Sequence, residues 1–261
     1  MSNLKKDQVK SVFSKNADAY VKSTTHSQGN DLEQMISWIQ PEPNWAALDL
    51  ATGGGHVAKL LAPDMGIVFA TDLTKDMLQN TASYLKHFPN IHYVVADAED
   101  IPFIDDTFDV IACRIAAHHF PHPERFIQEV NRVLKPGGKF LFIDNIAPED
   151  PELERFMNTF EEMRDPSHAR ALPISEWEDL LTKNHLSILK SNHTKKALPF
   201  QNWVTRTLDN ETQIKAVTDF FSSASDNVKQ HFEFIEENNL LQSFSLDHWM
   251  VLCEKKANKR S

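Results

Sequence analysis

Three glycines stand where a short apolar run gives way to a helical pattern. The run 46–51 is followed closely by Gly53, Gly54 and Gly55, and helical spacing begins directly after them. Glycine lets a backbone approach a ligand closely, and a helix that begins there offers free N–H groups. Gly53 and Gly55 therefore predict a nucleotide-binding turn, which together with Ala58 also fits the dinucleotide fingerprint G-x-G-x-x-G/A.

Acidic residues follow the next two apolar runs. Asp72 ends the second run, where a carboxylate can bind both hydroxyls of a ribose; the alternative is an N-cap for the next helix. Asp97, Ala98 and Glu99 follow the run 91–96. A short acidic loop can accept a hydrogen bond from an adenine amino group, while Ala98 leaves room for the ring. A solvated acidic turn is the alternative for Glu99.

The charge beside the glycine turn distinguishes between two classes of cofactor, those with a pyrophosphate and those without. A pyrophosphate is repelled by a carboxylate, yet Asp49 stands just before the glycines. S-adenosylmethionine has no phosphate and carries an α-ammonium group and a sulfonium, which a nearby carboxylate favours. The residues therefore favour S-adenosylmethionine as the cofactor. Two alternatives stay open: a nicotinamide-dependent oxidoreductase, and a protein that binds S-adenosylmethionine without catalysis.

A histidine pair follows the fourth apolar run, 108–113. His118 and His119 stand at the carboxyl edge of the expected sheet, where open α/β sheets bind their ligands. Both are candidates for a base or a positioning group toward a methyl acceptor. The alternative is that one of the two is a packing residue. Two histidines without a third ligand do not indicate a metal site.

A second candidate cluster stands in the segment 164–170. Arg164 or Arg170 can hold an anionic acceptor, and His168 can take its proton. The alternative is a helix end that is stabilised by arginine and stopped by Pro166. If the fourth and fifth strands are neighbours, the loops that follow them face each other, and the two clusters form one acceptor site.

An alternation of strands and helices is needed to bring these residues together. Short apolar runs that are separated by helical stretches predict a parallel sheet with right-handed crossovers. The expected strands are 46–51, 67–71, 91–96, 108–113, 139–144, 186–191 and an alternating run at 245–253. The residues 135–138 predict a turn before the fifth strand.

Helices are expected in the remaining segments. The helical patterns cover 8–40, 150–163 and 199–239, and Ser175 is expected to cap a helix at 176–184, with Glu178 in the capping-box position. We expect two units: an N-terminal helical lid at 1–44, and a domain at 45–261 with helical insertions at about 150–172 and 199–240.

Composition narrows the class of protein. The chain has 261 residues, of which 41% are hydrophobic and 25% charged, with a formal net charge of −10. This acidic balance argues against a nucleic-acid partner, and no apolar run approaches the roughly 18 residues of a membrane span. The segment 1–22 has no apolar signal-peptide centre, so we expect a cytoplasmic protein.

Cys113 and Cys253 lie in different expected strands and predict neither a disulfide nor a metal site. The expected partner is a small-molecule methyl acceptor, and both monomer and homodimer stay open.

Five motifs stand in order along residues 46–145: L-D-L-A-T-G-G-G, T-D-L-T-K-D-M-L, A-D-A-E-D-I-P-F, T-F-D-V-I-A-C-R and R-V-L-K-P-G-G. Their order and spacing resemble the class I S-adenosylmethionine-dependent methyltransferases, in particular the ubiquinone/menaquinone-biosynthesis branch. The resemblance implies a Rossmann-like α/β fold, with a seven-stranded, mostly parallel sheet whose last strand is antiparallel and which has helices on both faces. The family's first glycine in the turn is Ala51 here, for which we expect a right-handed backbone.

The resemblance also implies roles for single residues. It assigns the methionine end of the cofactor to Gly53 and Gly55, the ribose to Asp72, the adenine walls to Leu73 and Met77, and the adenine edge to Asp97 and Ala98. Asp49, Glu99 and Arg114 complete the expected cofactor set. The segment 12–20 looks like the family's N-terminal lid, with Tyr20 near the sulfonium; an ordinary amphipathic helix is the alternative. His26, in the continuation of that lid, joins Arg164 and Arg170 in the expected substrate set.

Overall fold

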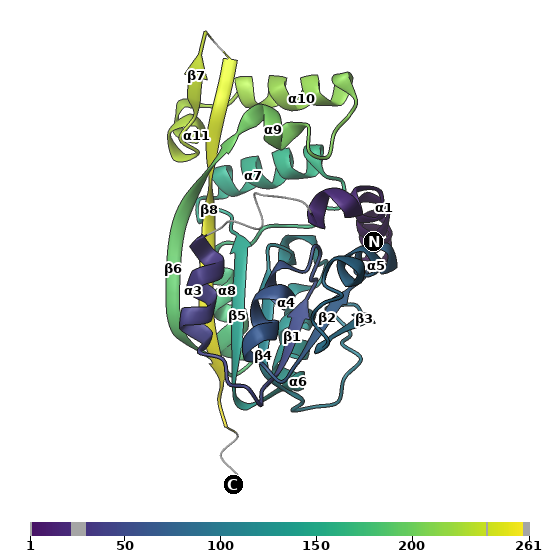
Figure 1. Cartoon of the computed structure of the whole chain (residues 1–261). Helices are drawn as coiled ribbons and strands as arrows, with labels where there is room; N and C mark the ends of the chain where they lie inside the picture. The colour runs from purple at the N-terminus through teal and green to yellow at the C-terminus, as the bar shows by residue number, and fades with distance from the viewer. Residues whose placement is uncertain (1, 22–29, 239, 258–261) are drawn as a thin grey trace.

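The computed structural model describes residues 2–21, 30–238 and 240–257, arranged around one mixed sheet (Figure 1). The strands are β1 Ala46–Leu50, β2 Ile67–Asp72, β3 Ile91–Val95, β4 Phe108–Arg114, β5 Leu134–Asn145, β6 Leu186–Pro199, β7 Ile235–Glu237 and β8 Leu240–Lys255. Their order in the sheet is β3-β2-β1-β4-β5-β8-β6, and the short β7 pairs with β8. Strands β1 to β5 pair in parallel, whereas β8 is antiparallel to both β5 and β6. The predicted Rossmann-like architecture is confirmed, with β7 as an additional eighth strand.

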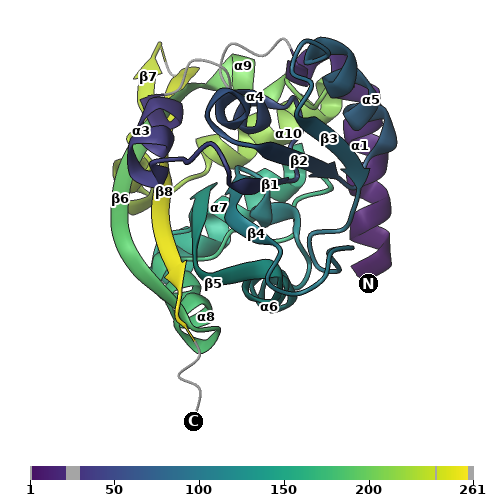
Figure 2. The same cartoon turned by 60° about the horizontal axis from the view of Figure 1, so that its bottom comes forward.

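Helices cover both faces of this sheet (Figure 2). The helices are α1 Ser2–Val21, α3 Asn30–Ile39, α4 His56–Leu61, α5 Lys75–Tyr84, α6 Pro123–Val133, α7 Pro151–Arg164, α8 Ile174–Lys183, α9 Phe200–Val204, α10 Glu211–Ser222 and α11 Asp226–His231, with 3₁₀ turns at η1 Ala62–Asp64 and η2 Ala117–His119. On one face α3 and α4 bury Met35 and Val57 against the sheet. On the other face α6 and α8 bury Phe126 and Trp177. Burial on both faces explains why the parallel strands are continuous apolar runs.

A separate aromatic core lies beyond the carboxyl ends of the parallel strands. Helices α7, α9, α10 and α11 and the far halves of β6 and β8 surround it (Figure 1). Its central rings belong to Phe156, Phe160, Trp203, Phe221 and Phe244. The ring centroids of Phe160 and Phe221 lie 4.9 Å apart, and those of Trp203 and Phe244 lie 5.0 Å apart. This core holds α7 and α9 over the edge of the sheet where the candidate residues stand.

Two local predictions are wrong. The residues 135–138 were expected to form a turn, but they belong to β5, and the left-handed Gly137 (φ 76°) is absorbed by a register shift between Phe108 and Val110. Ser175 does not cap α8, because the helix begins one residue earlier, with Pro173 at the N-cap. The Ser175 hydroxyl donates instead to Glu149 Oε2 at 2.5 Å.

The last third of the chain holds more strand than expected. The segment 199–239 was predicted to be helical, but it also contains β7, and both β6 and β8 extend well beyond the predicted runs. The extension is stable because Phe244 and Leu246 of β8 pack into the aromatic core. Cys113 and Cys253 are free and buried in β4 and β8, as predicted. No helix among the described residues is long and apolar enough to cross a membrane.

Candidate functional site

The glycine turn joins β1 to α4, and its glycines have different roles. Gly53 has φ 50°, and no described atom lies within 4 Å of a Cβ placed on it, so its backbone faces open space. Gly55 has φ 77°, and its Cβ would lie 2.4 Å from Thr81 Cγ2 and 2.8 Å from Leu85 Cδ1. Glycine is therefore needed at Gly55 to let α5 pack against the turn. Gly53 and Gly54 line the first cavity, described below, whereas Gly55 does not, so Gly55 is not the wall residue that was predicted.

Two non-glycine residues at this edge have left-handed backbones. Ala51 has φ 53°, so the expected right-handed conformation is wrong: the turn imposes the family's glycine geometry on an alanine. Ile115, directly after β4, has φ 54°, an outlying conformation for a β-branched residue. Its N–H donates to Ile143 O at 2.7 Å, which ties it to β5. Strained backbone of this kind concentrates at functional sites.

A first cavity, of about 1030 Å³ including the solvent at its mouth, opens over the ends of β1, β2 and β4. Eight of the residues predicted to bind a cofactor line it: Asp49, Gly53, Asp72, Leu73, Asp97, Ala98, Glu99 and Arg114. Met77, on α5, does not line it, because its side chain is fully buried. Met77 is therefore placed in the core and not on an adenine wall.

Asp49 and Asp72, two of the four carboxylates that line the first cavity, accept hydrogen bonds from the turns around them. Asp72 accepts from the N–H groups of Gly53 at 3.1 Å and Thr74 at 2.8 Å. Because Thr74 is the N-cap of α5, the capping alternative for Asp72 is wrong. Asp49 accepts from Thr52 Oγ1 at 2.5 Å and from Ala58 N at 2.9 Å. Burial raises the pKa of both carboxyls, that of Asp49 to about 7.

Arg114 ends β4 with its guanidinium on the wall of the first cavity. Its Nε donates to Asp31 Oδ2 at 2.6 Å. Its Nη2 is buried and has no hydrogen-bond acceptor among the described residues. An unsatisfied buried guanidinium nitrogen is costly, and a ligand carboxylate is the acceptor that this group binds best. Arg114 therefore fits an anionic group in the first cavity.

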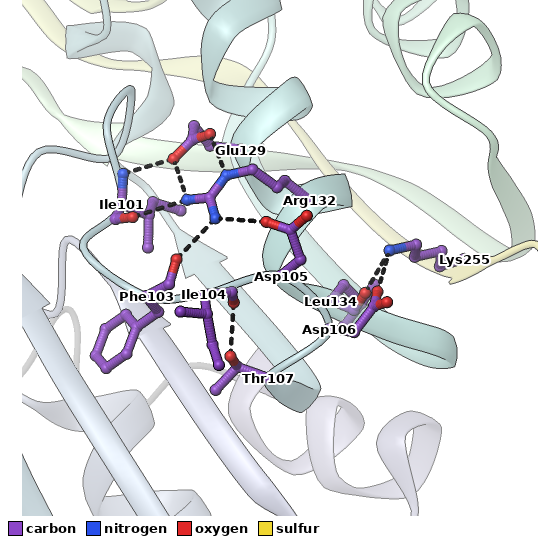
Figure 3. Close-up of polar contacts among 10 residues, drawn as sticks. All are labelled: Ile101, Phe103, Ile104, Asp105, Asp106, Thr107, Glu129, Arg132, Leu134 and Lys255. Carbon is purple, nitrogen blue, oxygen red and sulfur yellow. Dashed lines mark hydrogen bonds and ion pairs between the residues drawn. The ribbon is translucent and has the colours of Figure 1, made fainter.

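The loop 96–107 carries the adenine-edge candidates and is held rigidly by α6 (Figure 3). Arg132 Nη2 donates to Ile101 O at 2.8 Å, and its Nη1 donates to Phe103 O at 2.7 Å. Glu129 pairs with Arg132 and accepts from Ile101 N at 2.7 Å. The backbone of the loop is thereby fixed before any ligand binds.

Helix α1 reaches across the first cavity. Lys6 Nζ lies 2.6 Å from both Asp97 Oδ2 and Glu99 Oε2. The second oxygen of Glu99 accepts from His122 N at 2.7 Å. The preceding residue, Lys5, donates a hydrogen bond from Nζ to Glu162 Oε1 at 2.7 Å. Two adjacent lysines thus join α1 to the acidic loop and to α7.

A second cavity, of about 840 Å³ including solvent, lies between the sheet edge, α7 and α9. It shares Phe13, Ile115 and His119 with the first cavity. The structure places four of the predicted acceptor-site residues on its walls: His118, His119, Arg164 and His168. It adds several that the sequence did not single out, among them Asn145, Lys196, Trp203 and Arg206.

His118 is paired with a buried carboxylate. Its Nδ1 lies 2.7 Å from Asp144 Oδ1, and its backbone N–H donates to Asp144 Oδ2 at 3.0 Å. Burial acts to lower the pKa of His118, but the charge and hydrogen bond of Asp144 outweigh it, so the pKa lies above the ordinary 6.5. With Nδ1–H directed at Asp144, Nε2 is the nitrogen left to accept a proton.

The other two histidines are poorer bases. Burial, and then the charge of His118, lower the pKa of His119 to about 4 and that of His168 to about 2. His168 Nε2 lies 2.8 Å from Asn158 Oδ1, an oxygen that also accepts from Ala171 N at 2.7 Å. His168 therefore donates from Nε2. Its buried Nδ1 is left as an acceptor without a partner among the described residues.

The two arginines of the second cluster differ in position. Arg164 Nη2 lies 2.6 Å from Glu161 Oε2, and its guanidinium lies 4.9 Å from the centre of the Trp203 ring, inside the second cavity. Arg170 pairs with Glu154 and Glu176 at the surface and lines neither cavity, so its predicted place in the acceptor site is corrected.

Two predicted residues cannot be placed. Tyr20 belongs to α1, but its side chain is not among those that the structure describes. His26 lies outside the described residues altogether.

Comparison with known proteins agrees with this geometry. Residues 48–142 match a family model described as a methyltransferase domain. The chain is 35% identical over 222 residues to the uncharacterized methyltransferase YcgJ of Bacillus subtilis, covering 84% of this chain and 88% of that protein. The chain belongs to the class I S-adenosylmethionine-dependent methyltransferases.

Two further relatives show how far the likeness extends. The crystal structure of a putative methyltransferase from Bacillus halodurans superposes with a TM-score of 0.85 at 35% identity, covering 88% of this methyltransferase and 100% of that chain. The ubiquinone/menaquinone biosynthesis C-methyltransferase UbiE of Brucella abortus is 32% identical over 131 residues, or 47% of this chain and 49% of that protein.

One further residue of this methyltransferase's site could have been recognised from its position in the sequence. Asp144 ends the fifth apolar run, the same position that made Asp72 a candidate after the second. Lys6 and Lys196 carried no such signal, because lysine is common on exposed helix and strand faces. Only the packing of α1 and β6 brings them to the cavities.

Proposed function

We propose that this methyltransferase binds S-adenosylmethionine in the first cavity and methylates a small molecule held in the second. The observation that supports this most strongly is the wall that the cavities share, formed by Phe13, Ile115 and His119. When bound, S-adenosylmethionine supplies a methyl group on a sulfonium that is already a good leaving group. The task of the protein is then to align the acceptor in line with that methyl group and to exclude water.

The residues of the first cavity fit this cofactor at both ends. Arg114 Nη2 is a buried donor without an acceptor among the residues that the structure describes, and it can therefore bind the methionine carboxylate. Asp72 is fixed by two backbone N–H groups at the end of β2, where its free lone pairs can receive the ribose hydroxyls. Asp97 and Ala98 stand on the rigid loop for the adenine ring.

His118 acts as the base in this proposal. Asp144 orients the ring and raises its pKa, and Nε2 accepts the proton that the acceptor loses on methylation. His119, with its lowered pKa, stays neutral at the shared wall, and His168 Nδ1 offers a hydrogen-bond acceptor to the methyl acceptor. Three adjacent rings thus take different roles because their surroundings differ.

The segment 1–44 serves as a lid in this proposal, over a methyltransferase domain at 45–261. Lys5 and Lys6 of α1 already bridge from α7 to the acidic loop, and Phe13 forms part of both cavities. A lid in this position keeps water away from the shared wall, where the methyl group is transferred.

Calorimetry with S-adenosylmethionine and S-adenosylhomocysteine tests the cofactor, with NADH as the control. We expect both sulfur compounds to bind and NADH to leave their binding unchanged. Binding of NADH alone would support the oxidoreductase instead. A screen of quinols, phenols and small acids with methyl-labelled cofactor then tests turnover. If S-adenosylmethionine binds but no acceptor is labelled, the non-catalytic alternative holds.

A further inference from the structure

Lys196, a half-buried residue, places a positive charge on the wall of the second cavity. It lies on β6 opposite Leu246 of β8, and Leu198, two residues on, lines the same cavity. Its ammonium group makes no hydrogen bond or ion pair with any residue in the described part of the chain. The carboxylate whose charge acts on it most is Asp31, which is already bound to Arg114 at 2.6 Å. Burial lowers the pKa of Lys196, so the cation is held in an unfavourable place.

The acidic side chains on the walls of this cavity already have ion-pair or hydrogen-bond partners. Glu161 pairs with Arg164 at 2.6 Å. Asp165 accepts from the N–H and the hydroxyl of Ser167, at 2.9 and 2.5 Å. Neither of these carboxylates pairs with Lys196, and Asp31 is held by Arg114, so the positive charge of Lys196 has no counter-ion of its own among the described residues. A cavity with surplus positive charge selects an anionic ligand.

The cation and the proposed base belong to different strands around the second cavity. His118 sits over the end of β5 through Asp144, and β5, β8 and β6 are successive strands. Two strand spacings separate β5 from β6 by roughly 10 Å. The same cavity also has apolar wall residues, Met157, Leu198, Trp203 and Leu246.

We propose that the methyl acceptor is an amphiphilic small acid. Its anionic group binds the Lys196 ammonium, its apolar body lies along Trp203 and Leu198, and its nucleophilic group faces His118 Nε2. This inference rests on the proposed function and narrows the class of acceptor. Neutral quinols and phenols without an acidic substituent leave Lys196 unpaired and bind less well.

The test measures binding to protein saturated with S-adenosylhomocysteine, so that it does not depend on turnover. The probes are 4-hydroxybenzoate, 4-hydroxyphenylacetate and 3-(4-hydroxyphenyl)propanoate, each compared with its neutral amide by calorimetry. We expect at least one acid to bind about tenfold or more tightly than its amide, because a charge-assisted hydrogen bond is lost in the amide. Lys196→Met abolishes this preference, and Lys196→Arg keeps most of it.

Lys190→Met is the matched control. Lys190 lies on the same strand, exposed and over the Trp38 ring, about 20 Å from Lys196 along β6. This variant retains the preference for the acid. Equal binding of acid and amide in the wild type, absence of binding for every probe, or a preference that survives Lys196→Met overturns the inference. If S-adenosylhomocysteine still binds in these cases, the proposed function is not contradicted. If S-adenosylhomocysteine does not bind, the proposed function itself is overturned.

Discussion

The first cavity is lined by residues between 49 and 121, apart from three from α1, whereas the second draws its walls from residues scattered between Phe13 and Leu246. In the first cavity Asp49 and Asp72 accept hydrogen bonds from backbone N–H groups of turns at the strand ends, as Asp72 does from Thr74. In the second, side chains far apart in sequence fix one another, as for His118 and Asp144. If the proposed function holds, local turns provide much of the cofactor site, and long-range packing forms the acceptor site.

The difference extends to the cores behind the cavities. The first cavity stands on the sheet core, where Leu48, Ile111 and Phe140 lie in strands that the family shares. The second stands under the aromatic core of α7, α9, α10 and β8, which lies entirely outside the matched residues 48–142. We therefore expect that the second cavity can change without disturbing the first. The following predictions test that independence.

The largest expected effect separates the two cavities by function. His118→Gln removes the proposed base, and we expect the methyl-transfer rate to fall about 10²- to 10⁴-fold while the affinity for S-adenosylhomocysteine stays unchanged. His122→Gln is the control, since that half-exposed histidine lies outside both cavities. Labelled-cofactor assays and calorimetry measure the two quantities, and an equal loss in both variants would rule out His118 as the base.

The same base gives the reaction a defined pH dependence. A base must be deprotonated, so the wild-type rate rises with pH through a pKa above 6.5, because Asp144 stabilises the protonated ring. Asp144→Asn removes that charge and should move the rising limb to lower pH, with a lower maximal rate. A limb that stays in place after this substitution contradicts the role given to Asp144.

Asp72→Ala tests the first cavity. Two charge-assisted hydrogen bonds to a ribose are lost, so the affinity for S-adenosylhomocysteine should fall at least about tenfold. Asp76→Ala removes an exposed carboxylate from the first turn of α5 and should leave the affinity unchanged. Calorimetry that shows equal affinities for the wild type and Asp72→Ala would return Asp72 to a purely structural role in the turn.

A smaller effect is expected from the support of the acidic loop. Arg132→Met releases the backbone carbonyls of Ile101 and Phe103, and the loosened loop should weaken S-adenosylhomocysteine binding about threefold to tenfold. Arg125→Met, an exposed arginine on the same helix, serves as the control. Acid binding in the second cavity should be equal in both variants; a matching loss there would show that the cavities are not independent.

The smallest effect concerns the strained turn. Ala51→Gly relieves a left-handed alanine, and we expect stability to rise by about 1 kcal/mol, seen as a higher melting temperature. Ala62→Gly is the opposite case, because Ala62 has a right-handed backbone (φ −56°) and should lose about 0.5–1 kcal/mol. A lower melting temperature for Ala51→Gly would mean that the turn needs the alanine methyl group.

Sequence by itself determined the sheet, the glycine turn and the carboxylates at the strand ends. Apolar runs and turn residues act over a few positions, so the five parallel strands and the wall positions of Asp72, Asp97 and Arg114 followed from local chemistry and from the family resemblance. The same local reasoning misplaced Gly55. A side chain at this position would clash with Thr81, which lies on a helix that begins 20 residues later.

The sequence predicted that His118, His119, Arg164 and His168 would meet, but only the tertiary structure decided which other side chains join them in the second cavity. Nothing in the spacing of Lys196 distinguishes it from Lys195, whose side chain lies on the other face of β6, near Asp247. Nor does the sequence separate His118 from His119, whose pKa values move in opposite directions because only one of them meets Asp144. The physical reason is that burial and charge pairing depend on residues brought together by the sheet and the aromatic core, and not on neighbours along the chain.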